Sequence, residues 1–329
     1  MDPIADILET MQMTSVLCVR LDATAPWAFQ REVQKSELAH SGRLDGLSDY
    51  AHVAMVSRGG CWMKMENEAK PYALTSGDCF LLAPGTSYAL GDTPYTMPTN
   101  SIDDMMERGR TQSALSIGGG GASTTIICGS FRFKRLATKP LSMFLPRLIL
   151  TRDDQTRSLT LSSTIQMLSS EMAGQRVGRS VAVTRLVDLL LINMIRAYVE
   201  TAQGCPEGAW LHAIFDPKIG PALSLIHAHI AKPWTVEALA SEAGMSRSAF
   251  AARFKELLGQ PPLDYVAEWR MQKAAQRLSA GKPISETAKA VGYDSDAAFS
   301  KAFKRILGLS PRNYVGAVAS ERGTGFFAS

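Results

Sequence analysis

The chain has 329 residues, of which 46% are hydrophobic and 20% are charged, and its formal net charge is +4. This length predicts two or three domains, and the composition is typical of a globular protein. No apolar run approaches the roughly 18–20 residues that a membrane-spanning helix needs, and the acidic start Met1–Asp6 is unlike a secretory signal. These features argue against a membrane or secreted protein and predict a cytoplasmic one.

Residues 15–140 are rich in short strand-like runs with Gly, Pro and Asn between them. The runs expected to form strands are Ser15–Leu21, His52–Ser57, Cys61–Met65, Tyr72–Leu74, Asp78–Leu82 and Thr124–Phe133. Many short strands separated by turn signals predict a sandwich or a small barrel. The stretch from Gly77 to Tyr88, Gly-Asp-Cys-Phe-Leu-Leu-x-Pro-Gly-Thr-x-Tyr, resembles the second half of a cupin barrel motif.

Cupin enzymes hold a metal with His and Glu side chains of the barrel. Those ligands are mostly missing here, because no His-x-His occurs near Gly59–Glu66 and Tyr88 stands about where the later His would be. We therefore expect no cofactor and no catalysis, and a structural role for His52. The alternative is a metal-dependent cupin enzyme, for example a dioxygenase, fused to the C-terminal part of the chain.

Residues 92–123 end in four consecutive glycines, Gly118–Gly121. A phosphate-binding loop would need Gly-Lys-Ser/Thr after the glycines, and that sequence is absent. We therefore predict that this segment is a long, flexible loop.

Two helices are expected within residues 158–201, separated by Gly174–Gly178. The second has an apolar face at helical spacing, formed by Val183, Leu186, Val187, Leu190, Met194, Ile195 and Tyr198. Such a face fits burial against the chain's own barrel or against a second copy in a homodimer. Residues 202–215 contain Gly204, Pro206 and Gly208 and are expected to form a linker.

The C-terminal part contains one pattern twice. Seven positions agree at a constant offset of 49 residues: Phe250/Phe299, Phe254/Phe303, Lys255/Lys304, Gly259/Gly308, Pro262/Pro311, Tyr265/Tyr314 and Val266/Val315. Such an offset indicates internal duplication of one supersecondary unit.

Each copy follows a short amphipathic helix that ends at a glycine, Gly244 in the first copy and Gly292 in the second. Helix, short glycine turn, helix is the helix-turn-helix pattern. The expected N-caps are Thr235, Ser246 and either Asp294 or Ser295, and the second helices should end at Gly259 and Gly308. A leading helix over about Pro217–Ala231 and a long spacer helix over Leu263–Leu278 complete the unit.

Residues 216–318 resemble the DNA-binding domain of the AraC/XylS family of bacterial transcription regulators. The most specific part runs from Gly292-Tyr293 through Phe299-Ser-Lys-Ala-Phe-Lys304 to Gly308 and Tyr314, and the departure is Val315, where the family usually has Arg. The resemblance implies a regulator, more often an activator, whose partners are double-stranded DNA and RNA polymerase. It also implies that the barrel is an effector domain. A helical adaptor that binds another protein is the alternative.

The family resemblance assigns the DNA-contacting positions. The base-facing residues would be Arg247, Ser248, Ala251 and Ala252 in the first recognition helix, and Asp296, Ala297, Ser300 and Lys301 in the second. The phosphate-contacting candidates are Arg253, Lys255, Lys304, Arg305 and Arg312. Alanine offers only apolar contact to a base, so Arg247 and Lys301 are expected to carry much of the hydrogen-bonded readout.

The positive charge is concentrated in this part of the chain. Residues 216–318 hold 14 Lys and Arg against 9 Asp and Glu, a net charge of +5, whereas the remainder has a net charge of −1. The excess lies where phosphate neutralisation would require it.

The five cysteines are Cys18, Cys61, Cys79, Cys128 and Cys205, and no Cys-x-x-Cys occurs. In a cytosolic protein the ordinary expectation is reduced, buried thiols. The barrel with Cys18 near its start and Cys128-Gly129 in a late strand also resembles AraC-type regulators that sense reactive chlorine by cysteine oxidation. That resemblance implies Cys18 and Cys128 as a redox-sensing pair. A small-molecule ligand in the barrel, or no inducer, are the alternatives.

The sequence thus predicts an α+β chain with a cupin-like sensor domain, connecting helices and an all-α DNA-binding domain. The expected boundaries are 1–150 for the sensor, 151–215 for the connecting or dimerisation helices and linker, 216–318 for the double helix-turn-helix domain and 319–329 for a tail.

Overall fold

The computed structural model describes residues 14–33, 50–66, 68–109, 111–132, 146–153, 159–174, 176–201 and 209–324. These residues fall into two compact units, which divide between residues 207 and 208. Among them, no helix is both long and apolar enough to cross a membrane.

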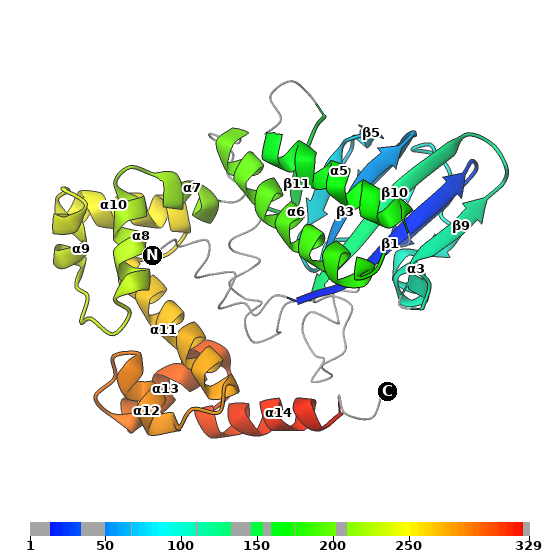
Figure 1. Ribbon diagram of the computed structural model, residues 1–329. Coiled ribbons are helices and arrows are strands. Elements are labelled where there is room, and N and C mark those ends of the chain that lie inside the picture. The colour runs from blue at the N-terminus through cyan, green and yellow to red at the C-terminus, as the bar shows by residue number, and fades with distance from the viewer. Residues whose placement is uncertain are drawn as a thin grey trace. The chain divides into compact units, whose positions relative to one another are not determined.

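The N-terminal unit is built on two packed sheets (Figure 1). The six-stranded sheet has the order β11–β6–β3–β10–β1–β9, and the five-stranded sheet has the order β5–β4–β7–β2–β8. The strands are β1 (Thr14–Thr24), β2 (Ala28–Arg31), β3 (Tyr50–Arg58), β4 (Gly60–Met65), β5 (Tyr72–Thr75), β6 (Cys79–Leu82), β7 (Tyr88–Gly91), β8 (Asn100–Ser101), β9 (Ala114–Gly118), β10 (Ser123–Arg132) and β11 (Leu148–Thr151). Neighbours pair antiparallel, except that β1 pairs β9 and β2 pairs β8 in parallel.

The six-stranded sheet is covered on both faces, which explains why β3 is buried almost along its whole length. Successive side chains of a strand point to opposite faces. Ala54 and Val56 therefore belong to the core between the sheets, whereas Val53 and Met55 are buried outside that core. The outer face is covered by α5 (Leu159–Ala173) and α6 (Arg179–Thr201), which pack on each other and cross the sheet in Figure 1.

The two connecting helices confirm the helical prediction for residues 158–201. The apolar face of α6 packs against β1 and β11 of its own chain, and Val187, Leu190, Met194 and Ile195 are buried there. Burial within the chain therefore accounts for this face.

Two segments that were predicted to be a loop and a linker contain helices and strands. Residues 92–123 were predicted to form a long loop, but they contain β8, helix α3 (Ile102–Gly109) and β9. Ile102, Met105 and Met106 of α3 are buried in the core of the barrel, so apolar burial holds this segment in place. Residues 209–215 were predicted to be part of a linker, but they form helix α7 (Ala209–Phe215), which packs on α8 and α10. Leu211 and Ala213 of α7 are buried against these neighbours, and the turn residues Gly204–Gly208 lie outside the described residues.

The C-terminal unit is all α-helical. After α7 come α8 (Ile219–Ala228), α9 (Val236–Glu242), α10 (Arg247–Leu258), α11 (Pro262–Ser279), α12 (Ile284–Ala290), α13 (Asp296–Leu307) and α14 (Pro311–Thr324). In Figure 1, the long helix α11 runs from the α8–α10 group to the α12–α14 group. The duplicated pattern is thus two helix-turn-helix motifs, α9–α10 and α12–α13, joined by one rigid helix.

Local sequence signals set the helix boundaries. Thr235, Ser246 and Ser295 each accept a hydrogen bond from the backbone N–H three residues later, which satisfies an otherwise free donor. Gly259 and Gly308 end the second helices with φ of 72° and 79°, a left-handed conformation that glycine adopts without a Cβ penalty. Of the two caps considered for the last motif, Ser295 is the one used.

Candidate DNA interface and candidate sensor site

The first recognition helix, α10, has one buried and one exposed side. Phe250, Phe254 and Leu258 are buried, and the phenyl rings of the two Phe residues lie 5.6 Å apart. Of the predicted base-facing residues, Arg247, Ser248 and Ala252 are exposed and Ala251 is half-buried. The core positions therefore fix the helix and leave the predicted readout face outward.

The second recognition helix, α13, repeats this arrangement. Phe299 and Phe303 are buried, with their ring centroids 5.5 Å apart. Asp296, Ala297 and Lys301 are exposed and Ser300 is half-buried. Ile306 and Leu307, at the end of the helix, are half-buried.

The predicted phosphate contacts divide into two kinds. Lys255, Lys304, Arg305 and Arg312 are exposed, and none forms an ion pair with any other described residue. Arg253 instead binds Asp216 with two guanidinium nitrogens, at 3.0 and 2.6 Å from the same carboxylate oxygen. The other Asp216 oxygen accepts the backbone N–H groups of Lys218 and Ile219, both at 2.9 Å. Arg253 therefore ties α10 to the start of α8.

Arg270 on α11 was not singled out from the sequence, although it joins both motifs. Its guanidinium donates to the carbonyls of Ile230 (3.0 Å) and Lys232 (2.8 Å), which precede α9, and to that of Gly292 (3.4 Å), in the turn before α13. A Cβ at Gly292 would lie 2.6 Å from the carbonyl oxygen of Ala231, so the two motifs touch backbone to backbone. Because α11 also carries Lys273 and Arg277, the sequence offered no signal that distinguished Arg270.

The barrel interior contains a small polar cluster around His52. The Tyr88 hydroxyl lies 3.2 Å from Nδ1 of His52, and Arg31 lies 3.3 Å from Asp103. Burial and the nearby Arg31 charge hold the pKa of His52 well below its usual value, so this imidazole is neutral. Tyr88 thus places a hydroxyl, and not a second imidazole, beside His52.

The donor set of this cluster does not fit a cupin metal. His52 is the one histidine in the described part of the barrel, and a phenol and an arginine complete its surroundings. Among the described residues, no group of three or more His, Cys, Asp and Glu side chains could hold a metal ion.

The two predicted redox cysteines lie on neighbouring strands but on opposite faces of the sheet. In the β1–β10 register Cys18 pairs with Gly129, and Cys128 pairs with Val19. Cys128 and Val19 belong to the core between the two sheets. Cys18 faces the helices, because its Sγ lies 3.9 Å from the Met172 sulfur of α5.

Both thiols are held in their protonated form. Burial raises the pKa of Cys18 to about 12, and the Arg179 charge opposes this effect only in part. Burial also raises the pKa of Cys128. Because the thiolate is the nucleophile, neither residue is activated in this conformation.

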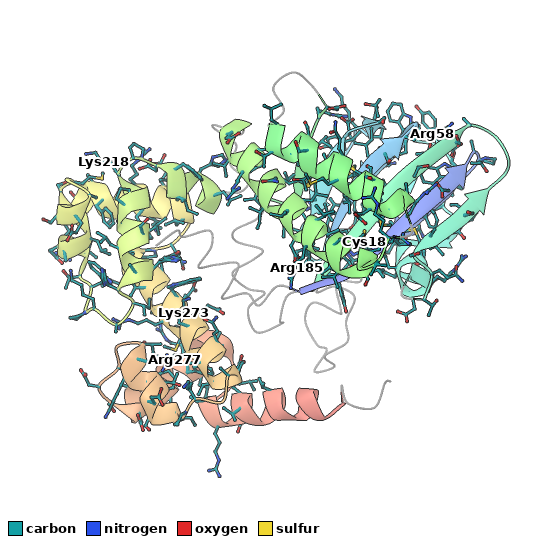
Figure 2. All side chains as sticks on the ribbon, in the orientation of Figure 1. Cys18, Arg58, Arg185, Lys218, Lys273 and Arg277 are labelled. Atoms are coloured by element: carbon teal, nitrogen blue, oxygen red, sulfur yellow. The ribbon has the colours of Figure 1, made fainter. Side chains whose placement is uncertain are left out.

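A cavity of about 380 Å³ lies beside Cys18, between the outer face of β1 and the first turns of α6. Met172 and Val183 contribute apolar surface, and Arg179 contributes the one charged side chain among its described lining residues. Figure 2 labels Cys18 where β1 passes beneath the two connecting helices.

Two linked helix-turn-helix motifs combined with a cupin-like barrel define a class, the DNA-binding transcription regulators with a cupin domain. Residues 2–200 match the family model described as Cupin, and residues 239–317 match the model described as Helix-turn-helix domain. A putative AraC-like transcription regulator of Streptomyces lividans is 30% identical over 303 residues, which are 92% of this chain and 94% of the relative. The chain belongs to the AraC-like transcription regulators.

Two further comparisons concern parts of the chain. The RCS-specific HTH-type transcriptional activator RclR of Escherichia coli is 28% identical over 243 residues, covering 73% of this chain and 78% of that protein. The solved DNA-binding domain of AdpA in complex with a target DNA is 32% identical and covers 33% of this chain and 97% of that domain, with a TM-score of 0.32.

Proposed function

We propose that α10 and α13 enter two successive major grooves on one face of DNA, about 34 Å apart, and that the bound protein activates transcription through RNA polymerase. The observation that carries the proposal is the matched pair of helices, each with a Ser N-cap, a buried Phe pair and an exposed opposite side. The name of the E. coli relative, a transcriptional activator, supports activation. Because its proposed target is chromosomal DNA, we propose that the protein acts in the cytoplasm.

Base readout is assigned to Arg247, Ser248, Ala251 and Ala252 on α10 and to Asp296, Ala297, Ser300 and Lys301 on α13. Lys255, Lys304, Arg305 and Arg312 are assigned to phosphates, because each is exposed and has no acidic partner in the described chain. The Asp216 pair supports a positioning role for Arg253 in place of a phosphate contact.

The test is a binding measurement on DNA selected from a random pool by the full-length protein. Affinities for the selected duplex and for a scrambled duplex are measured by fluorescence anisotropy over a range of salt concentrations. A specific regulator binds the selected site more tightly by about 10³-fold or more, and its affinity falls steeply with salt. Equal affinity for both duplexes would contradict the proposal, and loss of any salt dependence would point to the protein-binding adaptor.

We also propose that the N-terminal unit is a sensor and not an enzyme, since the His52–Tyr88 pair lacks the donors of a cupin metal. Elemental analysis of purified protein checks this, because a metal-dependent dioxygenase would carry about one metal ion per chain. A stoichiometric metal that is lost on substituting His52 by Ala would favour the enzyme.

For the input signal, the geometry supports a ligand in preference to a Cys18–Cys128 disulfide. The thiols face opposite sides of the sheet, whereas a ligand-sized cavity lies against Cys18. Induction by sublethal hypochlorous acid in wild type, lost in either Cys→Ser variant, would instead establish the redox route.

A further inference from the structure

The cavity beside Cys18 has the size of a small-molecule site and lies outside the barrel. Its volume of about 380 Å³ is near the lower end of the range for ligand pockets, roughly 300–1,000 Å³. It lies between the outer face of β1, the ends of α3 and α5, and the first turns of α6. All these elements belong to the N-terminal unit.

One wall of this cavity is apolar. Met172 comes from α5, and Val183 and Val187 come from α6. These side chains can cover the apolar body of a ligand, and the polarisable Met172 sulfur favours contact with an aromatic ring.

The second requirement, a positive charge that can bind the anionic group of a ligand, is met by Arg179 at the start of α6. Its guanidinium donates to the Met172 carbonyl at 3.3 Å and reaches the Ser113 hydroxyl at 3.5 Å. It forms no ion pair with any residue in the described ranges, and no acidic side chain is among the described residues that line the cavity. A guanidinium has five N–H donors, so donors remain for a ligand, and the positive end of the α6 dipole lies at the same place.

We propose that this cavity binds a small organic anion, with a carboxylate on Arg179 and a short apolar or aromatic body against Met172, Val183 and Val187. The planar guanidinium can hold a carboxylate with two parallel hydrogen bonds. The inference rests on the proposed function, since it makes this anion the effector of the regulator. The proposed effector site therefore lies between β1 and α6, outside the barrel interior.

Binding is tested on the full-length protein by calorimetry with 4-phenylbutanoate as the probe and 4-phenyl-1-butanol as its neutral counterpart. We expect the carboxylate to bind and the alcohol to bind at least ~10-fold more weakly, because only the anion pairs with the guanidinium. Arg179→Gln should weaken carboxylate binding at least ~10-fold, whereas Arg179→Lys, which keeps the charge but loses the planar fork, should have a smaller effect.

The matched control is Arg185→Gln. Arg185 lies on the same helix (Figure 2). Its side chain is 77% exposed and pairs with Asp188, and neither residue lines the cavity. This variant should bind the probe like wild type. Equal binding by wild type and Arg179→Gln, or equal binding of the acid and the alcohol, would overturn the proposal.

The reactivity of Cys18 provides a second test of ligand binding, and this test uses only the wild-type protein. Its thiol lines the cavity, so the probe should slow alkylation of Cys18 by iodoacetamide at pH 9, followed by peptide mass spectrometry. Unchanged alkylation of Cys18 at a saturating probe concentration would overturn the proposal. Binding of the selected DNA by Arg179→Gln without the probe reports on the proposed function separately, because that substitution leaves α10 and α13 untouched.

Discussion

Cys18 and Cys128 lie on adjacent strands, one residue out of register, and their side chains leave opposite faces of the same sheet. A disulfide needs Cβ atoms about 3.5–4.5 Å apart with the side chains directed at each other. Because side chains alternate along a strand, only a one-residue slip between β1 and β10 would bring both thiols to one face. That slip would move the whole buried set of one strand out of the core.

We therefore predict that mild oxidation of the folded protein yields no Cys18–Cys128 disulfide. Peptide mass spectrometry without reduction, after diamide or hypochlorous acid, makes the measurement. Cys18 should be modified first, since it lines the cavity, and Cys128 should react only after unfolding in urea. Appearance of the cross-linked peptide under native conditions would show that the sheet rearranges, and would revive the redox pair.

For the recognition helices, we predict that Arg247→Ala and Lys301→Ala lower affinity for the selected site by about 1–3 kcal/mol and relax its sequence preference. Lys255→Ala and Lys304→Ala should weaken binding to all sequences alike and reduce the salt slope by about one. If Arg247→Ala and Lys301→Ala left the sequence preference unchanged, the assignment of base-reading residues would be wrong.

Glu237 provides a control for Arg247. The Arg247–Glu237 ion pair, at 2.8 Å, is largely exposed on both sides, and exposed ion pairs contribute little to stability. Glu237→Gln should therefore leave folding unchanged and raise DNA affinity slightly, because it frees Arg247. A loss of affinity would mean that Glu237 itself positions the helix.

Arg270 is predicted to set the distance between the two recognition helices. Arg270→Gln removes a charged donor that serves three backbone carbonyls, which should cost on the order of 1–3 kcal/mol of stability. In the variant that remains folded, the affinity for a DNA site that spans two major grooves should fall by a larger factor than the affinity for a duplex with only one half-site. Both affinities are measured by anisotropy at a temperature where the variant is folded.

A purely stabilising role for Arg270 predicts a different outcome. The two affinities would then fall by the same factor, in proportion to the unfolded fraction. Arg270→Lys serves as the intermediate case, because it keeps the charge but cannot reach three carbonyls with a planar fork.

Asp216 should make the stability of the C-terminal unit sensitive to acid. Burial by itself would raise the pKa of Asp216, but hydrogen bonds from the Ile219 and Lys218 backbone N–H groups and from Arg253 outweigh it, so the pKa is lowered. A carboxyl with a lowered pKa contributes stability that is present above its unfolded pKa of about 3.9 and lost as the pH falls through the folded value. Urea unfolding followed by circular dichroism at several pH values should show this loss below about pH 4.

Asp216→Asn should lower the free energy of unfolding near neutral pH. It should also make that free energy less dependent on pH below about pH 4 (the acid limb of the curve), because the amide cannot titrate. The matched control is Asp294→Asn, an exposed carboxyl with no ion pair among the described residues. Identical acid limbs for wild type and Asp216→Asn would show that other groups dominate.

The sequence by itself determined the features whose causes are local. The 49-residue repeat, the Ser246 cap, the glycine ends at 259 and 308 and the buried Phe pairs could all be predicted, since each depends on residues within a turn or two of helix, whereas the sequence left the cap of the last motif open between Asp294 and Ser295. The alternating runs likewise predicted most of the long strands. For the same reason the exposed side of each recognition helix, and with it the candidate DNA interface, could be assigned in advance.

Only the tertiary structure decided the features that depend on distant segments. The strand register placed Cys18 and Cys128 on opposite faces, and the buried apolar residues of α3 turned an expected loop into part of the core. The Arg253–Asp216 pair joins residues 37 positions apart, and the Arg270 contacts and the Arg179 cavity each join several elements. The spacing of residues along the chain does not predict these long-range contacts, because they depend on how whole helices and strands pack against each other.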